Sequence, residues 1–249
     1  MTRSLRWLAL VHLVTNALLL WFGYYWLGLG ESRASTLAWS ALVAVVVVSV
    51  GCCAYGAALV YFRPEATQRV VAAWRTALRN LLPLAVAALA AIAIYYLLAR
   101  WADYSTTLAT KFASYLTLTF RKPVKPSSIL RAFNVVLWLV RWVILPVSLL
   151  PMLSAIAGDG WRGFRAFGAF TRKWLYWIEA PLLLLGALAL PLKLLGWVPQ
   201  VGGFGMQTAS FVLRAGVAYL LFVTAWLLLA FITSAGKPRF TQAETVASP

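Results

Sequence analysis

Four ionisable side chains lie inside stretches of the sequence that are otherwise apolar: His12, Arg141, Glu179 and Arg214. Arg141, for example, lies in the middle of LWLVRWVILP, Leu137–Pro146. A charged side chain at the centre of a lipid bilayer costs about 3 kcal/mol even on lenient insertion scales, so such groups usually face a protein partner or a water-filled cavity. These four residues are therefore the first candidates for chemistry.

His12 and Glu179 are suited to proton transfer, because a histidine beside a carboxylate can exchange a proton. With a rise of about 1.5 Å per residue, each lies about 8 Å to the cytoplasmic side of the midpoint of its apolar run. We therefore predict that the two side chains meet, either as a proton-linked pair or as one structural hydrogen bond between helices. A lone histidine can also ligate haem or chlorophyll, but it supplies a single axial ligand, and we predict no cofactor.

Arg141 and Arg214 lie about 6 and 10 Å to the outer side of their midpoints. We predict that Arg141 faces the protein interior near Arg214, because its side chain reaches only partway to the headgroups. Backbone carbonyls freed by Pro146 or Pro151 are the expected acceptors, since proline removes a helical donor. An anion held between the two arginines would instead make this the site of a transporter or channel.

The sequence contains no catalytic motif. One histidine excludes HExxH zinc chemistry, and Glu179 is the only carboxylate inside an apolar run. No Gly-x-Ser-x-Gly occurs, and GGFG at 202–205 lacks the strand-to-helix context of a phosphate loop. The adjacent Cys52 and Cys53 lack metal-ligand spacing. We therefore predict a protein that is not an enzyme and binds no metal.

The composition places these residues in a membrane protein. Of the 249 residues 63% are hydrophobic and only 11% are charged, whereas about a quarter of the residues are charged in soluble domains. Runs of about twenty apolar residues predict transmembrane helices. We predict an all-α, polytopic bundle forming a single membrane domain, with six spans at 5–29, 36–62, 81–101, 132–157, 174–195 and 209–233.

Two basic segments between the spans are predicted to lie as amphipathic helices at the membrane surface, at 65–80 and 161–173. In each, arginines lie opposite an apolar face that contains tryptophan or phenylalanine, a pattern typical of interfacial helices. The residues expected to bind anionic lipid headgroups are Arg69, Arg75, Arg79, Arg162, Arg165, Arg172 and Lys173.

Residues 104–120 are harder to place, because threonines and serines cover one face of the helical wheel and aromatic and leucine side chains the other. This segment could lie at the interface, re-enter the membrane or cross it as a seventh span. We favour six spans with an interfacial or re-entrant helix. A crossing would invert every later segment and move the basic stretch at 161–173 to the outside.

The charge of +16 lies between apolar runs, which favours anionic lipid over nucleic acid as the partner. With a cytoplasmic N-terminus, twelve basic residues lie inside and eight outside. The composition resembles a bacterial inner-membrane protein, with a short polar tail at 237–249. We expect an accessory subunit, assembly factor or scaffold that binds anionic lipids and other membrane subunits; the alternative is a small anion transporter or channel that uses Arg141 and Arg214.

Overall fold

A computed structural model describes residues 3–30, 32–63, 69–170, 174–199 and 202–234. Within these ranges the chain is helical, without strands, and six helical segments are long and apolar enough to cross a membrane. The predicted all-α, multi-pass class is therefore confirmed. The polar tail predicted at 237–249 lies outside the described residues, as do residues 65–68 of the first predicted interfacial helix.

The long helices are α1 (Arg3–Leu27), α2 (Ala34–Tyr61), α4 (Leu81–Phe120), α7 (Tyr176–Gly196) and α8 (Phe204–Ser234). The fourth membrane-length segment begins with α5 (Pro126–Leu139), continues through the π-helical turn η1 (Val140–Ile144) and then forms α6 (Leu145–Asp159). The short helix α3 (Val70–Arg79) and the 3₁₀ helix η2 (Gly160–Phe170) correspond to the two predicted interfacial segments.

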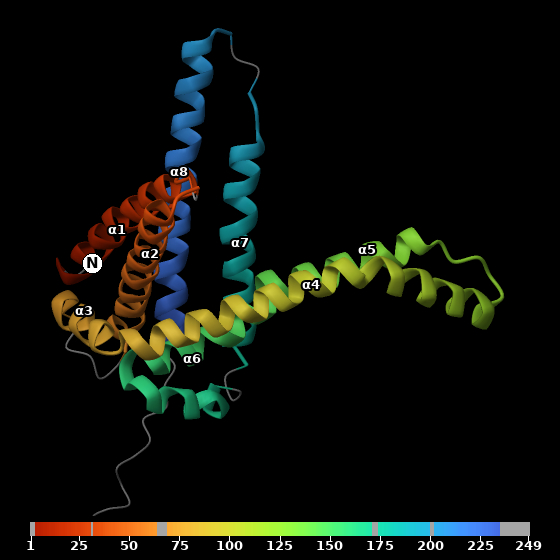
Figure 1. Ribbon diagram of the computed structural model, residues 1–249, viewed down its shortest axis with the longest axis horizontal. Coiled ribbons are helices and arrows are strands. Elements are labelled where there is room, and N and C mark those ends of the chain that lie inside the picture. Colours follow the sequence, from red (N-terminus) through yellow and green to blue (C-terminus); the bar gives the residue numbers. More distant parts are fainter. Residues whose placement is uncertain (1–2, 31, 64–68, 171–173, 200–201, 235–249) are drawn as a thin grey trace, which may run out of the picture.

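Residues 104–120 do not form the separate helix that the prediction of an interfacial or re-entrant helix assumed. They are the second half of α4, which continues without a break for 40 residues. Arg121 has a φ of 52°, in the left-handed region, and ends the helix. The chain then reverses, and α5 runs back along α4, as Figure 1 shows.

Small side chains hold this hairpin together. Ser105, Ala109 and Ala113, spaced four residues apart on one face of α4, are all buried. Such a stripe lets two helix backbones approach closely, which is how helices commonly associate in membranes. The Phe112 and Phe133 rings lie 6.2 Å apart and connect the two helices near the tip.

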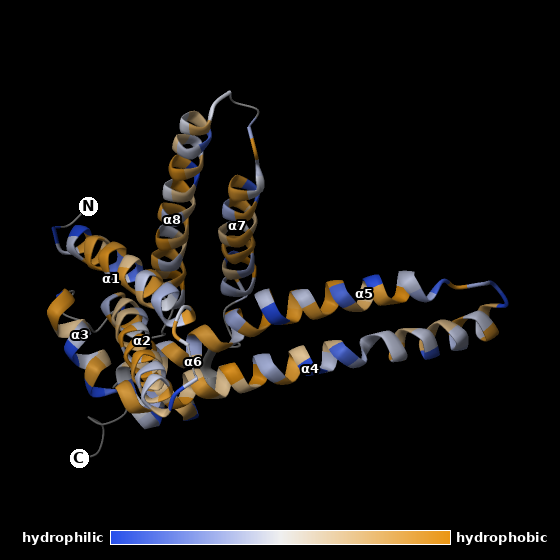
Figure 2. Ribbon diagram, turned by 45° about the horizontal axis from the view of Figure 1, so that its top comes forward, coloured by the Kyte–Doolittle hydropathy of each residue, from blue (hydrophilic) through white to orange (hydrophobic). Residues whose placement is uncertain are grey.

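The six long segments do not stand parallel. In Figures 1 and 2 the α4–α5 hairpin and the α7–α8 hairpin leave a common base in clearly different directions, and α1 and α2 lie beside α8. The Tyr176 hydroxyl, in the first turn of α7, donates to the Val147 carbonyl of α6 at 2.7 Å. The middle of the α5–α6 segment therefore passes the beginning of α7, not its middle.

The main core lies at this common base. Its buried side chains come from α1, α2, α3, α4, α6 and α8, and include Leu8, Ala57, Ala77, Ile156 and Ala230. Many are alanines, and Gly56 packs with Leu84, Ala77 and Ala157 around it. Close packing of small residues thus fixes the relative positions of the helices at one end of the molecule.

Candidate functional site

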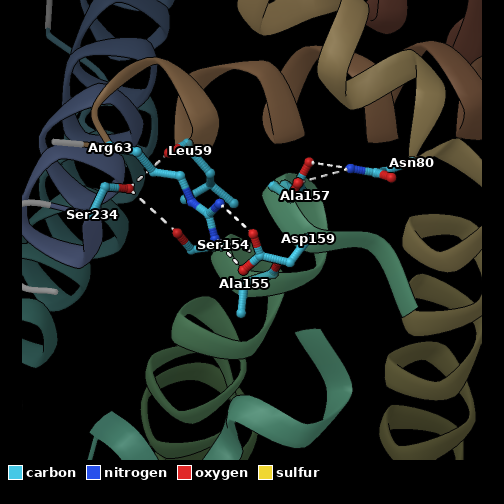
Figure 3. Close-up of polar contacts among 9 residues, drawn as sticks. Leu59, Arg63, Asn80, Ser154, Ala155, Ala157, Asp159 and Ser234 are labelled. Carbon is cyan, nitrogen blue, oxygen red and sulfur yellow. Dashed lines mark hydrogen bonds and ion pairs between the residues drawn. The ribbon is translucent and has the colours of Figure 1, made fainter. Parts of the chain in front are cut away.

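An ion pair between the ends of α2 and α6 organises the base (Figure 3). Arg63, directly after α2, is buried, and its two terminal nitrogens donate to the two carboxylate oxygens of Asp159 at 3.0 and 3.1 Å. Nη2 also contacts the Ala155 carbonyl at 3.5 Å. A bidentate arginine–carboxylate pair fixes the relative orientation of the two groups as well as their separation. The pair therefore joins α2 and α6 in one orientation.

Asn80, between α3 and α4, binds the same end of α6. Its side-chain nitrogen donates to the carbonyls of Ala157 and Gly158 at 2.9 and 3.2 Å, as Figure 3 shows. Carbonyls in the last turn of a helix lack partners within the helix, so this amide stabilises the end of α6. Gly160 follows with a φ of 61°, a conformation that glycine adopts without strain, and the chain turns into η2.

A serine pair attaches α8 to the base. The Ser234 hydroxyl donates to the Leu59 carbonyl of α2 at 2.9 Å and lies 3.4 Å from the Ser154 hydroxyl of α6. Together with Arg63 and Asn80, these contacts bring α2, α4, α6 and α8 to one point. These contacts join the four helices at the base, and the short helix α3 packs into the same core.

The helix α3 presents three kinds of surface. Ala73 and Ala77 are buried against the bundle. Val71 and Leu78 are 80% and 61% exposed, so this apolar strip is not covered by the protein. The three arginines predicted for this segment, Arg69, Arg75 and Arg79, are all exposed. An apolar strip beside exposed guanidinium groups is the arrangement expected at the boundary between acyl chains and headgroups.

The 3₁₀ helix η2 folds back on α6. Gly163 lies against the backbone of Ala155 and Ile156 so closely that a Cβ would collide with it. Phe164 packs on the core and stacks with Trp161, while Arg162 and Arg165 are exposed. Arg172 and Lys173, predicted for the same surface, lie outside the described residues.

The beginning of α1 lies at the same end, because the Tyr61 hydroxyl at the end of α2 donates to Ser4 at 3.0 Å. We call this surface the basic end. Its exposed basic residues are Arg3, Arg6, Arg69, Arg75, Arg79, Arg162 and Arg165. In the described parts of the chain, ion pairs join Arg63 to Asp159 and Arg100 to Asp103, and neither pair includes one of these seven residues.

The predicted contact between His12 and Glu179 is wrong. His12 is fully buried in α1, and neither of its ring nitrogens has a hydrogen-bond partner within the described ranges. Glu179 lies in the first turn of α7 and is exposed. A carboxylate in a first helical turn interacts favourably with the helix dipole, which accounts for Glu179 without a histidine.

Arg214 is buried, and its guanidinium is bound by backbone carbonyls at the end of α7. Nη1 lies 3.4 Å from the carbonyls of Leu194 and Leu195 and also bonds Trp197, while Nε donates to Ser210 at 3.2 Å. A cation at a helix C-terminus is favoured by the unpaired carbonyls and the dipole there. Arg214 of α8 therefore caps the C-terminal end of α7.

Arg141 lies in the π-helical turn, half-buried, which agrees in part with the predicted inward orientation. Its Nε is buried and has no hydrogen-bond partner in the described chain, so the predicted carbonyl acceptor is not found there. Arg141 and Arg214 are not brought together. The α6 segment after Arg141 meets α7 at Tyr176, whereas Arg214 meets it at Leu194, about 27 Å further along the helix.

The sequence analysis did not predict the cluster of polar contacts at the base, nor a second polar cluster in the middle of the bundle. In that second cluster the Tyr55 hydroxyl of α2 donates to Asn16 Oδ1 of α1 at 2.5 Å. From the sequence, Arg63 and Asp159 were only two charged residues outside the apolar runs, because nothing in the sequence signals a contact between residues that are 96 positions apart.

Comparison of the chain with protein-family models, curated proteins and solved structures finds no match.

Proposed function

We propose that this chain is a non-enzymatic integral membrane protein that serves as a scaffold or accessory subunit. It would bind anionic lipid headgroups through the basic end and partner membrane helices through the sides of its hairpins. Its compartment would be the bacterial cytoplasmic membrane, with the N-terminus and the basic end on the cytoplasmic side. The observation that carries the proposal is the gathering of arginines from α1, α3 and η2 at one end of the molecule.

The arrangement at the basic end suits a flat anionic surface better than a small soluble anion. The arginines are spread over three elements and are exposed. Val71 and Leu78 add an uncovered apolar strip beside them. Each arginine near an anionic membrane surface contributes about 1 kcal/mol of attraction, and apolar burial adds to it.

The sides of the hairpins support the second part of the proposal. In the most apolar stretches of α7 and α4 only 6% and 17% of the residues are buried within the chain. Lipid alone can cover such helices. However, Arg141 in the α5–α6 segment keeps a buried nitrogen without a partner in the described chain, and a neighbouring subunit could supply the acceptor.

The lipid proposal is tested by replacing Arg75, Arg79, Arg162 and Arg165 with glutamine. Native mass spectrometry of the purified protein, from membranes containing phosphatidylglycerol and phosphatidylethanolamine, should show fewer retained phosphatidylglycerol molecules. One kcal/mol corresponds to about a fivefold change in affinity, so four charges give a large difference. The loss should be larger at low salt, because screening weakens exposed charges.

A matched control uses four basic residues at the tip of the α4–α5 hairpin: Arg121, Lys122, Lys125 and Arg131, which are also exposed. Their replacement by glutamine removes the same charge from a different part of the molecule. No loss of phosphatidylglycerol from the basic-end variant would show that the basic end is not a lipid-binding surface, and an equal loss in both variants would show that lipid retention follows the number of charges and not the basic end.

The partner proposal is tested by photo-crosslinking in native membranes from a residue on the uncovered side of α7. Leu190 is 58% exposed and suits a benzoyl-phenylalanine probe, whereas the buried Ala180 provides the control position. A scaffold should give one discrete protein adduct from position 190 and none from position 180. Lipid adducts alone from position 190 would contradict a partner on this face.

A further inference from the structure

A cleft of about 450 Å³ lies between α1, α2, α7 and α8, well away from the basic end. Most of its lining is apolar and includes Leu19, Pro191, Leu195 and Phe222. Three polar side chains complete it: Asn16 of α1, Tyr55 of α2 and Tyr219 of α8. A mostly apolar cleft of this size with a few polar groups is the usual form of a small-molecule site.

The polar side chains are held in place by one another and by the backbone. Asn16, which is 4% exposed, donates to the His12 carbonyl at 2.8 Å and accepts from the Tyr55 hydroxyl at 2.5 Å. The Tyr219 hydroxyl donates to the Leu13 carbonyl. The Tyr55 ring also packs edge-on against Trp226, with centroids 4.7 Å apart. This mutual support keeps the three groups in fixed positions.

The cluster retains unused hydrogen-bonding capacity. An amide nitrogen carries two hydrogens, and the described chain provides an acceptor for one of those on Asn16. The phenol oxygens of Tyr55 and Tyr219 each use their hydrogen and keep lone pairs. One turn away on the same helix, His12 is fully buried with both ring nitrogens unpaired in the described ranges.

The position and charge of the cleft limit what it can hold. Asn16 and Tyr219 lie near the midpoints of α1 and α8, so the polar cluster lies near the middle of the bilayer, where phosphate headgroups do not reach. None of its lining side chains is ionisable at neutral pH as a cation or carboxylate. A charged head placed against Asn16, Tyr55 and Tyr219 would therefore be buried without a counter-charge beside it, which is costly.

We propose that this cleft binds one molecule of a neutral amphiphile dissolved in the membrane, with a carbonyl-bearing ring on an apolar tail. The free N–H of Asn16 donates to the carbonyl oxygen of the ring. Tyr55, Tyr219 and Phe222 supply aromatic surface for the ring, and the aliphatic residues of α7 line the path of the tail. This inference does not depend on the proposed scaffold function, because none of the cleft residues belongs to the basic end.

The test measures equilibrium binding of a benzoquinone with a decyl tail to the purified full chain in detergent, with protein-free micelles subtracted. Wild type should bind one molecule saturably. Ala215→Phe, which fills the cleft, should abolish binding, and Asn16→Leu should weaken it about tenfold, as expected for one lost hydrogen bond. Tyr55→Phe, which frees Asn16 to turn, should weaken it about threefold.

Two controls keep the result interpretable. Tyr104→Phe alters a tyrosine on α4 that is 68% exposed and outside the cleft, and should bind as wild type does. Decanoate carries an alkyl tail one carbon shorter with an anionic head, and should bind at least tenfold more weakly than the quinone.

Before binding is measured, each variant is checked for the same size-exclusion elution volume and melting temperature as wild type. If Asn16→Leu fails to fold, the conservative substitution Tyr55→Phe provides the test of the polar cluster. Saturable binding that survives in Ala215→Phe, decanoate binding as tight as that of the quinone, or no saturable binding by wild type would overturn the proposal.

Discussion

In the described chain the two buried arginines, Arg63 and Arg214, bond nearby backbone carbonyls and one carboxylate, although Arg63 Nε has no partner. Arg214 binds the end of α7, and Arg63 binds the end of α6. The sequence indicated that Arg214 was embedded, because a charge in an apolar run is visible, but it gave no such sign for Arg63, which follows its run. It did not indicate their neighbours, since depth along a helix says nothing about the angle at which another helix crosses it.

We expect opposite behaviour from the two arginines that were predicted to form one site. Arg214→Leu leaves the carbonyls of Leu194, Leu195 and Trp197 without their cation, and should lower the free energy of unfolding by about 2 kcal/mol. Arg141→Leu removes a group with an unpaired buried nitrogen, and should change it by less than about 1 kcal/mol. Thermal unfolding in detergent measures the stability of both variants. A larger loss of stability in Arg141→Leu than in Arg214→Leu would contradict this prediction.

The Arg63–Asp159 pair should behave asymmetrically. The Arg63 side chain is 9% exposed and that of Asp159 is 44% exposed. Asp159→Asn should cost about 3 kcal/mol, because it leaves the buried Arg63 cation without its counter-charge, whereas Arg63→Leu leaves only a carboxylate that is close to water and should cost about 1 kcal/mol. A double-mutant cycle reports their coupling, and two independent, additive losses would show that the pair does not hold α2 to α6.

At the scale of elements, the amphipathic pattern of α3 and the six apolar runs were sufficient to predict the helices, because their apolar periodicity and length are local properties. The length of α4 was not predictable in this way. Threonines and serines in its second half indicated a separate helix, yet Thr110, Ser114 and Thr119 bond carbonyls of their own helix and are accommodated within it. The buried partner of that half is α5, which only the tertiary structure reveals.

Docking of η2 on α6 depends on a single glycine. A Cβ at position 163 would collide with the α6 backbone, which cannot move away as a flexible side chain could. Gly163→Ala should therefore destabilise the base by about 2 kcal/mol and increase proteolysis between residues 160 and 170. Gly186→Ala in α7, where nothing lies within 4 Å of the new Cβ, is the matched control and should be neutral or slightly stabilising. Equal resistance of the two variants to protease would contradict close packing of η2.

For the whole molecule, the divergence of the two hairpins and the length of α4 have one physical explanation. A helix of 40 residues is about 60 Å long, whereas a bilayer with its headgroups is about 40–45 Å thick. A helix that exceeds the membrane thickness adjusts by tilting. A strongly tilted α4–α5 hairpin beside a more upright α7–α8 hairpin would bring the basic tip at Arg121–Arg131 to the headgroups opposite the basic end.

Cysteine accessibility in intact cells measures this arrangement directly. With Cys52 and Cys53 replaced by alanine, single cysteines are introduced at Arg75 in α3, Arg162 in η2 and Ser127 at the hairpin tip, all exposed positions. We expect a membrane-impermeant maleimide to label position 127 in intact cells, and positions 75 and 162 only after permeabilisation. Labelling of position 75 or 162 from the same side as 127 would contradict a membrane protein with one basic, lipid-binding end.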